Sequence, residues 1–146
     1  MEIPLGLPAL DNLVRAGQLK AEPRNDKEVE RMLALARTRL GDARLSGASR
    51  EGRFTSAYNA AHSAALAALR WHGYRSENRF VVFQCLVHTL GWPPERWRVL
   101  DSAHKKRNLA EYEGRLDVEE SGIAELIALT ADLIADAAKL ARSSGK

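Results

Sequence analysis

The spacing of apolar residues constrains this chain most, because apolar side chains recur every three or four positions along three long stretches. The stripes are Val29, Leu33, Ala36, Leu40 and Ala43; Phe54, Tyr58, Ala61, Ala65 and Ala68; and Ile123, Leu126, Ile127, Leu133, Ile134, Ala137 and Leu140. This period places apolar residues along one side of an α-helix, whereas a half-buried strand needs strict alternation. The pattern predicts an all-α protein without a sheet, an up-and-down bundle of about four core helices with a shorter helix and an N-terminal arm.

Proline, glycine and capping residues divide the chain into segments. We expect an arm over residues 1–24 with a brief helix at about 8–17, a bundle over 25–143 and a tail over 144–146. The first long helix starts at Asn25 or Asp26 and ends before Gly47. Further helices are expected over about 50–72, 78–90, from Pro93 and Pro94 to a stop at Gly114, and over about 117–143, where Asp117 and Glu120 have capping-box spacing.

Composition and charge favour one folded domain. The 146 residues are 45% apolar and 28% charged, which is typical of a globular chain and argues against disorder. The net charge of +3 is too small to indicate nucleic-acid binding by itself. Charge is segregated, however: residues 96–107 are mainly basic and residues 111–136 mainly acidic. This segregation predicts either opposed surface patches or two solvated helix faces that attract each other.

The sequence gives little sign of redox chemistry or of a membrane. The one cysteine, Cys85, lies in an apolar run and is interpreted as a buried thiol. The first residues lack the features of a signal peptide, and no apolar run approaches the roughly 20 residues of a membrane helix. We therefore expect a cytoplasmic protein without membrane contact. No Cys/His pair has zinc spacing and no motif predicts a cofactor, so neither is expected.

Arg107 is the first candidate functional residue, because it lies on an apolar side of its helix. At about 100° per residue, that side is shared with Leu100, Ala103 and Ala110. A guanidinium in such a position needs a partner or an opening to water. Glu111, one turn further on, is the local candidate, and an ion pair between the two at the edge of the bundle is the purely structural interpretation.

The adjoining stripe of the same helix carries further polar groups. Trp97, His104 and Asn108 share this stripe, and Lys105 and Lys106 add positive charge beside it. An aromatic ring, an imidazole, an amide and cationic side chains together are suited to binding an anion or a base. The sequence therefore predicts a binding site on this helix.

Two segments give the chain a resemblance to a known family. Residues 53–62 (RFTSAYNAAH) and 107–112 (RNLAEY) resemble the HEPN superfamily, and the likeness covers most of residues 26–140. The resemblance implies a small bacterial helical bundle, often dimeric and often encoded beside a minimal nucleotidyltransferase, with toxin–antitoxin or defence functions. Active members resembling this chain are metal-independent ribonucleases whose motif is an arginine, a polar residue, a few variable positions and a histidine.

The chain departs from that motif at its last position. Arg107 and Asn108 match the first two motif residues, but Tyr112 stands where the resemblance implies a histidine. A histidine exchanges protons near neutral pH, whereas a tyrosine hydroxyl is a poor base there. Of His62, His72, His88 and His104, the last is the best substitute because it lies one turn before Asn108. The degenerate motif therefore favours binding over catalysis.

A second group of candidates lies on the helix expected over 50–72. Tyr58, Asn59 and His62 fall within about one turn, and Tyr58 and His62 share a face. They are either a core aromatic with a hydrogen-bonded histidine or, as the resemblance implies, side chains that orient Arg107. The second interpretation places this turn beside the arginine motif.

We expect an HEPN-like nucleic-acid or nucleotide-binding module in a toxin–antitoxin or defence setting. An active metal-independent endoribonuclease that uses Arg107, Asn108 and His104 is one alternative. The other is a partner of a nucleotidyltransferase, with Tyr112 as a modification acceptor. We expect the module to be a homodimer, because Arg107 and Tyr112 are roughly 140° apart on an ideal helix and a second copy would bring them together. The stripe of Leu100, Ala103 and Ala110 is the predicted contact.

Overall fold

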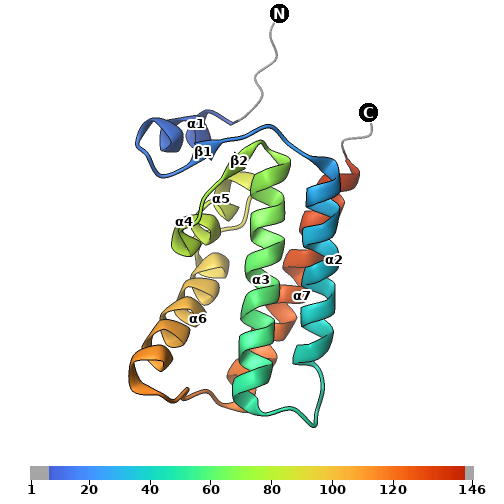
Figure 1. The fold of residues 1–146 in the computed structure, drawn as a ribbon, viewed down its shortest axis with the longest axis vertical. Helices are drawn as coiled ribbons and strands as arrows, with labels where there is room; N and C mark the ends of the chain where they lie inside the picture. Colours follow the sequence, from blue (N-terminus) through green and yellow to red (C-terminus); the bar gives the residue numbers. More distant parts are fainter. Residues whose placement is uncertain (1–6, 144–146) are drawn as a thin grey trace, which may run out of the picture.

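The computed structural model describes residues 7–143, which form an α-helical bundle (Figure 1). Its helices are α1 (Pro8–Arg15), α2 (Asp26–Ala43), α3 (Arg50–Trp71), α4 (Arg79–Gln84), α5 (Leu86–Thr89), α6 (Pro94–Glu113) and α7 (Glu120–Arg142). The all-α prediction is confirmed. The first six residues of the predicted arm and the predicted tail over 144–146 lie outside the described residues.

Helix α3 lies at the centre of the bundle. It packs against α2 and α7 on one side and against α4, α5 and α6 on the other (Figure 1). Most of its buried residues are alanines, so neighbouring backbones can approach closely. The predicted stripes of α2 and α3 are buried throughout, whereas Ile127 and Leu140 in the α7 stripe are only partly buried.

Several helix ends follow from local capping. The Asn25 side chain accepts a hydrogen bond from the Glu28 backbone N–H at 3.0 Å, as predicted for the start of α2. Gly114 ends α6 with φ of +74°, a left-handed conformation in which a Cβ atom would be strained. The predicted cap at Asp117 is wrong, because α7 begins at Glu120 after an N-cap at Glu119 that makes no side-chain hydrogen bond. Leu116 and Val118 pack on the core, which keeps this segment extended for two more residues.

The helix predicted over 78–90 is divided into α4 and α5 at Cys85. The break follows from burial: Val81, Val82 and Phe83 are buried before it, and Leu86 is buried after it. One straight helix cannot direct all of these side chains to the same core, so the chain turns between them. Cys85 itself is buried, as predicted, and burial raises the pKa of its thiol to about 12.

The prediction that no sheet is present is wrong for one short element. Strands β1 (Lys20–Ala21) and β2 (Tyr74–Arg75) pair antiparallel, with Lys20 opposite Arg75 and Ala21 opposite Tyr74. Strands of two residues have no periodicity that sequence analysis can detect, and their partners are remote in the chain. The pair fastens the N-terminal arm over the end of α3 (Figure 1).

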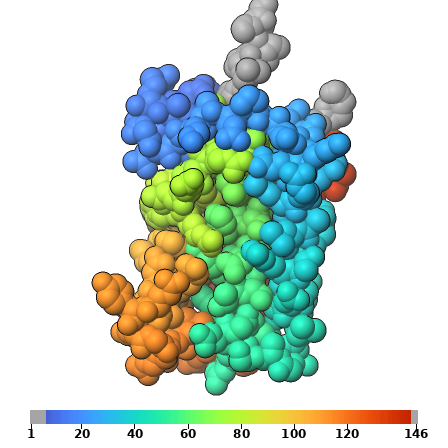
Figure 2. Space-filling model, viewed as in Figure 1, coloured from blue at the N-terminus to red at the C-terminus, as the bar shows by residue number. Residues whose placement is uncertain are grey.

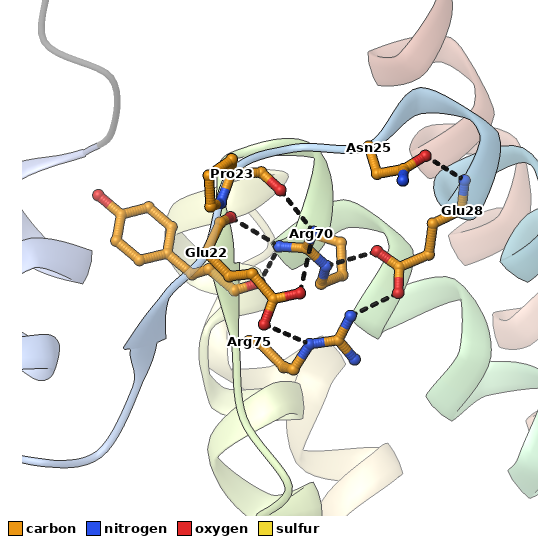
Figure 3. A network of polar contacts seen from close by, with 7 residues as sticks. Glu22, Pro23, Asn25, Glu28, Arg70 and Arg75 are labelled. Carbon is orange, nitrogen blue, oxygen red and sulfur yellow. Dashed lines mark hydrogen bonds and ion pairs between the residues drawn. The ribbon is translucent and has the colours of Figure 1, made fainter.

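A buried arginine holds the arm at this end of the bundle (Figure 3). Only 1% of the Arg70 side chain is exposed. Its Nε donates to the Glu28 carboxylate at 2.8 Å, and Nη1 donates to the backbone oxygens of Glu22 at 2.9 Å and Tyr74 at 3.4 Å. Its Nη2 donates to the Pro23 carbonyl at 2.7 Å and lies 3.6 Å from the Glu22 carboxylate. Four hydrogen bonds and a nearby carboxylate therefore surround this guanidinium.

Arg75 adds a second cation to the same carboxylates. It lies 3.2 Å from a Glu22 carboxylate oxygen and also binds the Glu28 carboxylate (Figure 3). Desolvation by burial is the largest single effect on the pKa of Glu28 and raises it. The hydrogen bonds and charges of Arg70 and Arg75 together outweigh this effect, so the pKa is lowered. We refer to Glu22, Glu28, Arg70 and Arg75 as the arm clamp. Sequence analysis did not identify it.

Helix α6 contributes buried side chains to the bundle only from its first half. Trp97, Leu100 and Ala103 are buried, but no residue from 104 to 113 is. The predicted dimer contact is therefore wrong in its first two members, since Leu100 and Ala103 are already covered by the chain's own core. The second half of α6 leaves its polar side chains available beside α3.

Candidate functional site

Tyr58 of α3 forms the floor of the candidate site. Its ring is 0% exposed, and its edge packs against Phe83 of α4 with ring centroids 6.0 Å apart. Its hydroxyl lies 2.8 Å from Nδ1 of His104 on α6, and the two rings are tilted by only 21°. The predicted turn of α3 is thus brought to the predicted helix of the arginine motif. This contact fixes the start of the exposed half of α6.

His104 is bonded through both ring nitrogens. Its Nε2 lies 3.2 Å from the amide nitrogen of Asn108. Because an amide nitrogen only donates, Nε2 accepts and the proton of the neutral ring is placed on Nδ1, which donates to the Tyr58 oxygen. Burial chiefly lowers the pKa of His104, Arg107 and Arg79 lower it further, and Asp101 opposes them. The imidazole is therefore predominantly neutral at pH 7.

Arg107 lies over the same tyrosine. Its Cζ atom is 5.5 Å from the centroid of the Tyr58 ring, within the range of a cation–π interaction. Its Nη2 is also 3.4 Å from the Glu111 carboxylate, with the two side chains 32% and 67% exposed respectively. The ion pair that we expected is present, but a pair this exposed contributes little. The guanidinium is thus held by a ring and remains open to water.

Arg79 joins the site from α4, which sequence analysis did not predict. Its Cζ atom lies 5.4 Å from the Tyr58 centroid, and its Nη1 donates to the Asn59 side-chain oxygen at 3.4 Å. Within residues 7–143, no carboxylate is at ion-pair distance from Arg79. Two guanidinium groups from different helices therefore share one buried ring.

His62 lies close enough to these groups for their charges to affect its pKa. Its Nε2 is buried and has no hydrogen-bond partner in the described chain, and its ring meets Phe83 edge-on at 6.1 Å. Its pKa is lowered to about 4, first by burial and then by electrostatic effects of Arg79, Arg39, His104 and Arg107. These arginines belong to α4, α2 and α6, so three helices contribute arginines to the field at His62.

We name this group the arginine–tyrosine site. Its members are Arg39 from α2; Tyr58, Asn59 and His62 from α3; Arg79 from α4; and His104, Arg107 and Asn108 from α6. These four helices lie next to one another on the face drawn in Figure 2. Arg39 follows Ala36 of the buried stripe by three residues, and this position beside the stripe is the one sequence signal for it. Nothing in the sequence distinguishes Arg79.

Three other predicted site residues lie elsewhere. Trp97 is buried, meets Phe80 with ring centroids 5.9 Å apart, and lines a separate cavity of about 290 Å³ beside Leu13 and Cys85. Lys105 pairs with Asp101 at 3.2 Å. Lys106 donates to the Asp117 backbone oxygen at 3.4 Å. Both lysines therefore contact groups outside the arginine–tyrosine site. The buried ring of Trp97 is not available to a ligand.

Tyr112 is separated from the site. Its side chain is 92% exposed and makes no hydrogen bond or ring contact within the described residues. It lies five positions beyond Arg107, which places it on another side of α6. Within one chain, the tyrosine of the degenerate motif therefore does not act together with its arginine.

The structure also bears on metals and membranes. Within residues 7–143, the His, Cys, Asp and Glu side chains form no group of three that could coordinate a metal ion. Each helix of that range falls short of the length or the apolar character that spanning a bilayer requires. Comparison with known proteins adds no identification: no family model, no curated protein and no solved structure matches the chain.

Proposed function

We propose that this protein is an HEPN-like module that binds RNA or a nucleotide through the arginine–tyrosine site. The observation that carries the proposal is the placement of Arg79 and Arg107 over one buried tyrosine ring. Among the described residues, the exposed carboxylate of Glu111 pairs with Arg107, and no carboxylate pairs with Arg79. A guanidinium presents several donors in a planar fork that matches a phosphate group. Two guanidinium groups over one ring, of which only Arg107 has an ion pair in the described chain, leave donors that a phosphate can bind.

The surrounding residues support binding in preference to catalysis. Tyr58 and Asn108 engage both nitrogens of His104, so the imidazole has no free ring nitrogen to direct at a ligand. Tyr112 lies outside the site. The second candidate function is a metal-independent endoribonuclease, and the neutral His104 beside Arg107 favours it. In that case His104 must exchange one of its two hydrogen bonds for the substrate.

RNA binding tests the main proposal. We expect a single-stranded RNA oligonucleotide, labelled at its 3′ end, to bind the full chain, with the dissociation constant followed by fluorescence anisotropy. Arg107→Ala should weaken binding by about tenfold or more, because a charge-assisted hydrogen bond contributes about 1.5 to 3 kcal/mol. Arg31→Ala, an exposed arginine on α2, is the control. Equal affinity of both variants and the wild type rejects the site.

The same samples distinguish the two functions. The binding proposal expects the oligonucleotide to stay intact after incubation with EDTA. Cleavage that Arg107→Ala abolishes would establish the ribonuclease instead.

The toxin–antitoxin or defence setting, a nucleotidyltransferase partner and a homodimer remain part of the proposal through the resemblance. We propose the exposed end of α6 as the dimer contact, and the exposure of Leu109 and Tyr112 supports this choice. A second copy placed there would bring Tyr112 towards the arginine–tyrosine site of its partner. Sedimentation of the wild type and of Leu109→Glu tests this: a monomer in both rejects the dimer.

A further inference from the structure

We infer that the arginine–tyrosine site binds the terminal phosphate of an RNA or nucleotide and does not read its bases. This inference rests on the proposed function and specifies which part of the ligand the site recognises. It is carried by the excess of cationic groups around Tyr58 and by the burial of the Tyr58 and Trp97 rings.

The first observation is the charge balance. Arg79 and Arg107 lie over one ring, and Arg39 acts on His62 from the opposite helix, α2. Within residues 7–143, Glu111 alone is at ion-pair distance from any of these three arginines. A terminal phosphate carries a charge of about −1.5 to −2 at pH 7, whereas each internal phosphodiester carries about −1. The more highly charged group matches this cluster better.

Two carboxylates, those of Asp101 and Glu111, lie close to the cationic groups of the site. Asp101 acts on His104, but its own ion pair is with Lys105 at 3.2 Å. Glu111 is 67% exposed and binds Arg107 at 3.4 Å, so water can replace it without burying an unpaired charge. A ligand phosphate can therefore displace the carboxylate from Arg107, while Arg79 needs no displacement.

The second observation concerns stacking. Sequence-specific recognition of single-stranded RNA relies on bases that stack on aromatic side chains and bond through their edges. Tyr58 is fully buried and its hydroxyl is bound to His104. Trp97 is buried, and the ring of Phe80, which is 36% exposed, meets Trp97. Neither Tyr58 nor Trp97 presents a free ring face to a base, so the site is better suited to recognise the phosphate.

A third observation concerns the His62 imidazole. Its buried Nε2 has no partner among the described residues, and burial, followed by the effect of neighbouring arginines, keeps the ring neutral. An anion bound to those arginines would offset part of their effect on this ring.

The experiment measures how tightly the full-length protein binds RNAs that differ only in their terminal phosphate. Three oligonucleotides of one sequence carry a 5′-phosphate, a 3′-phosphate or neither, and each competes unlabelled against the labelled RNA used above. We expect at least one phosphorylated form to bind about tenfold more tightly than the form without a terminal phosphate. A second set with an unrelated sequence should give the same affinities within about twofold.

Variants at Arg79 test whether the preference for a phosphorylated RNA end depends on the arginine–tyrosine site. Arg79→Ala should remove the preference for the phosphorylated end, and Arg79→Lys should retain part of it, because lysine keeps the charge but loses the planar fork. Arg37→Ala, an exposed arginine on the same helix as Arg39, should leave it unchanged. Thermal unfolding followed by circular dichroism confirms that each variant is folded.

The outcomes separate the two levels of the proposal. Equal binding of all three RNA ends, with binding still dependent on Arg107, overturns the terminal-phosphate inference and leaves the proposed function intact. A preference that persists in Arg79→Ala, or a strong dependence on sequence, also overturns the inference. Failure of every oligonucleotide to bind rejects both the inference and the proposed function.

Discussion

The arm clamp and the arginine–tyrosine site both place arginines against or on helix α3, but the charges around those arginines differ in sign. Arg70 is buried between two glutamates and backbone carbonyls, and its guanidinium donates four hydrogen bonds to them. Arg79 and Arg107 instead each lie over the Tyr58 ring, and both act on the nearby His62 and His104. The contrast separates an arginine whose hydrogen bonds are used within the fold from arginines whose donors remain available for a ligand.

The sharpest test of this comparison is to remove each type of arginine. Arg70→Met should lower the free energy of unfolding by about 3 to 5 kcal/mol, because it leaves backbone carbonyls without a donor and leaves Glu28 with Arg75 alone. Arg79→Met should change it by only about 0.5 kcal/mol, since the group is partly exposed and has no ion pair within residues 7–143. Urea unfolding at pH 7 measures both. Similar losses in the two variants would contradict the distinction.

Acid should weaken the two regions in different pH ranges. The pKa of His62 falls from 6.5 to about 4 on folding, so between these values the unfolded chain binds a proton that the folded chain does not. The free energy of unfolding should therefore decrease as pH falls from 6.5 to 4, by up to about 1.4 kcal/mol per pH unit for this residue. The depressed pKa of Glu28 keeps its contribution intact until the pH falls below about 4.5.

Two variants assign these ranges. Urea unfolding across pH 7 to 3.5 should show a shallower slope above pH 4.5 in His62→Gln than in the wild type. Glu28→Gln should be less stable at pH 7 and should keep the wild-type slope above pH 4.5. His72 and His104 also have lowered pKa values, so the comparison rests on the difference between variant and wild type. An unchanged slope in His62→Gln would show that this histidine is not the group that titrates.

The smallest effect concerns the one carboxylate paired with an arginine of the site. Glu111→Gln should change the free energy of unfolding by only a few tenths of a kcal/mol, as is typical of an exposed i,i+4 pair. It should strengthen RNA binding about twofold, because Arg107 is no longer shared with a competing anion. Glu113→Gln, on the same helix without an ion pair in the described chain, is the control for overall charge. Equal gains in both variants would indicate a general charge effect.

The two regions also show what could be predicted from sequence. The helices follow from periodicity and capping because these signals are local, as at Asn25 and in the stripe that starts at Val29. The approach of Tyr58 to His104 was expected only from a family resemblance, since it joins residues 46 positions apart. The arm clamp, Arg39 and Arg79 were missed. Which arginine finds a glutamate and which finds a ring depends on tertiary packing, and their sequence neighbourhoods do not differ in any useful way.

The shallow packing of α6 has a consequence for how the protein moves. A helix segment without buried side chains is held mainly by its own backbone hydrogen bonds, so it opens locally at a small fraction of the energy of global unfolding. The half of α6 beyond Ala103 meets this description, whereas α3 is buried along most of its length. Backbone amides in the end of α6 should exchange with solvent through fraying that leaves the rest of the bundle closed. We therefore expect Arg107 and Asn108 to lie on a weakly protected helical segment, and a ligand that binds them should also order the helix that presents them.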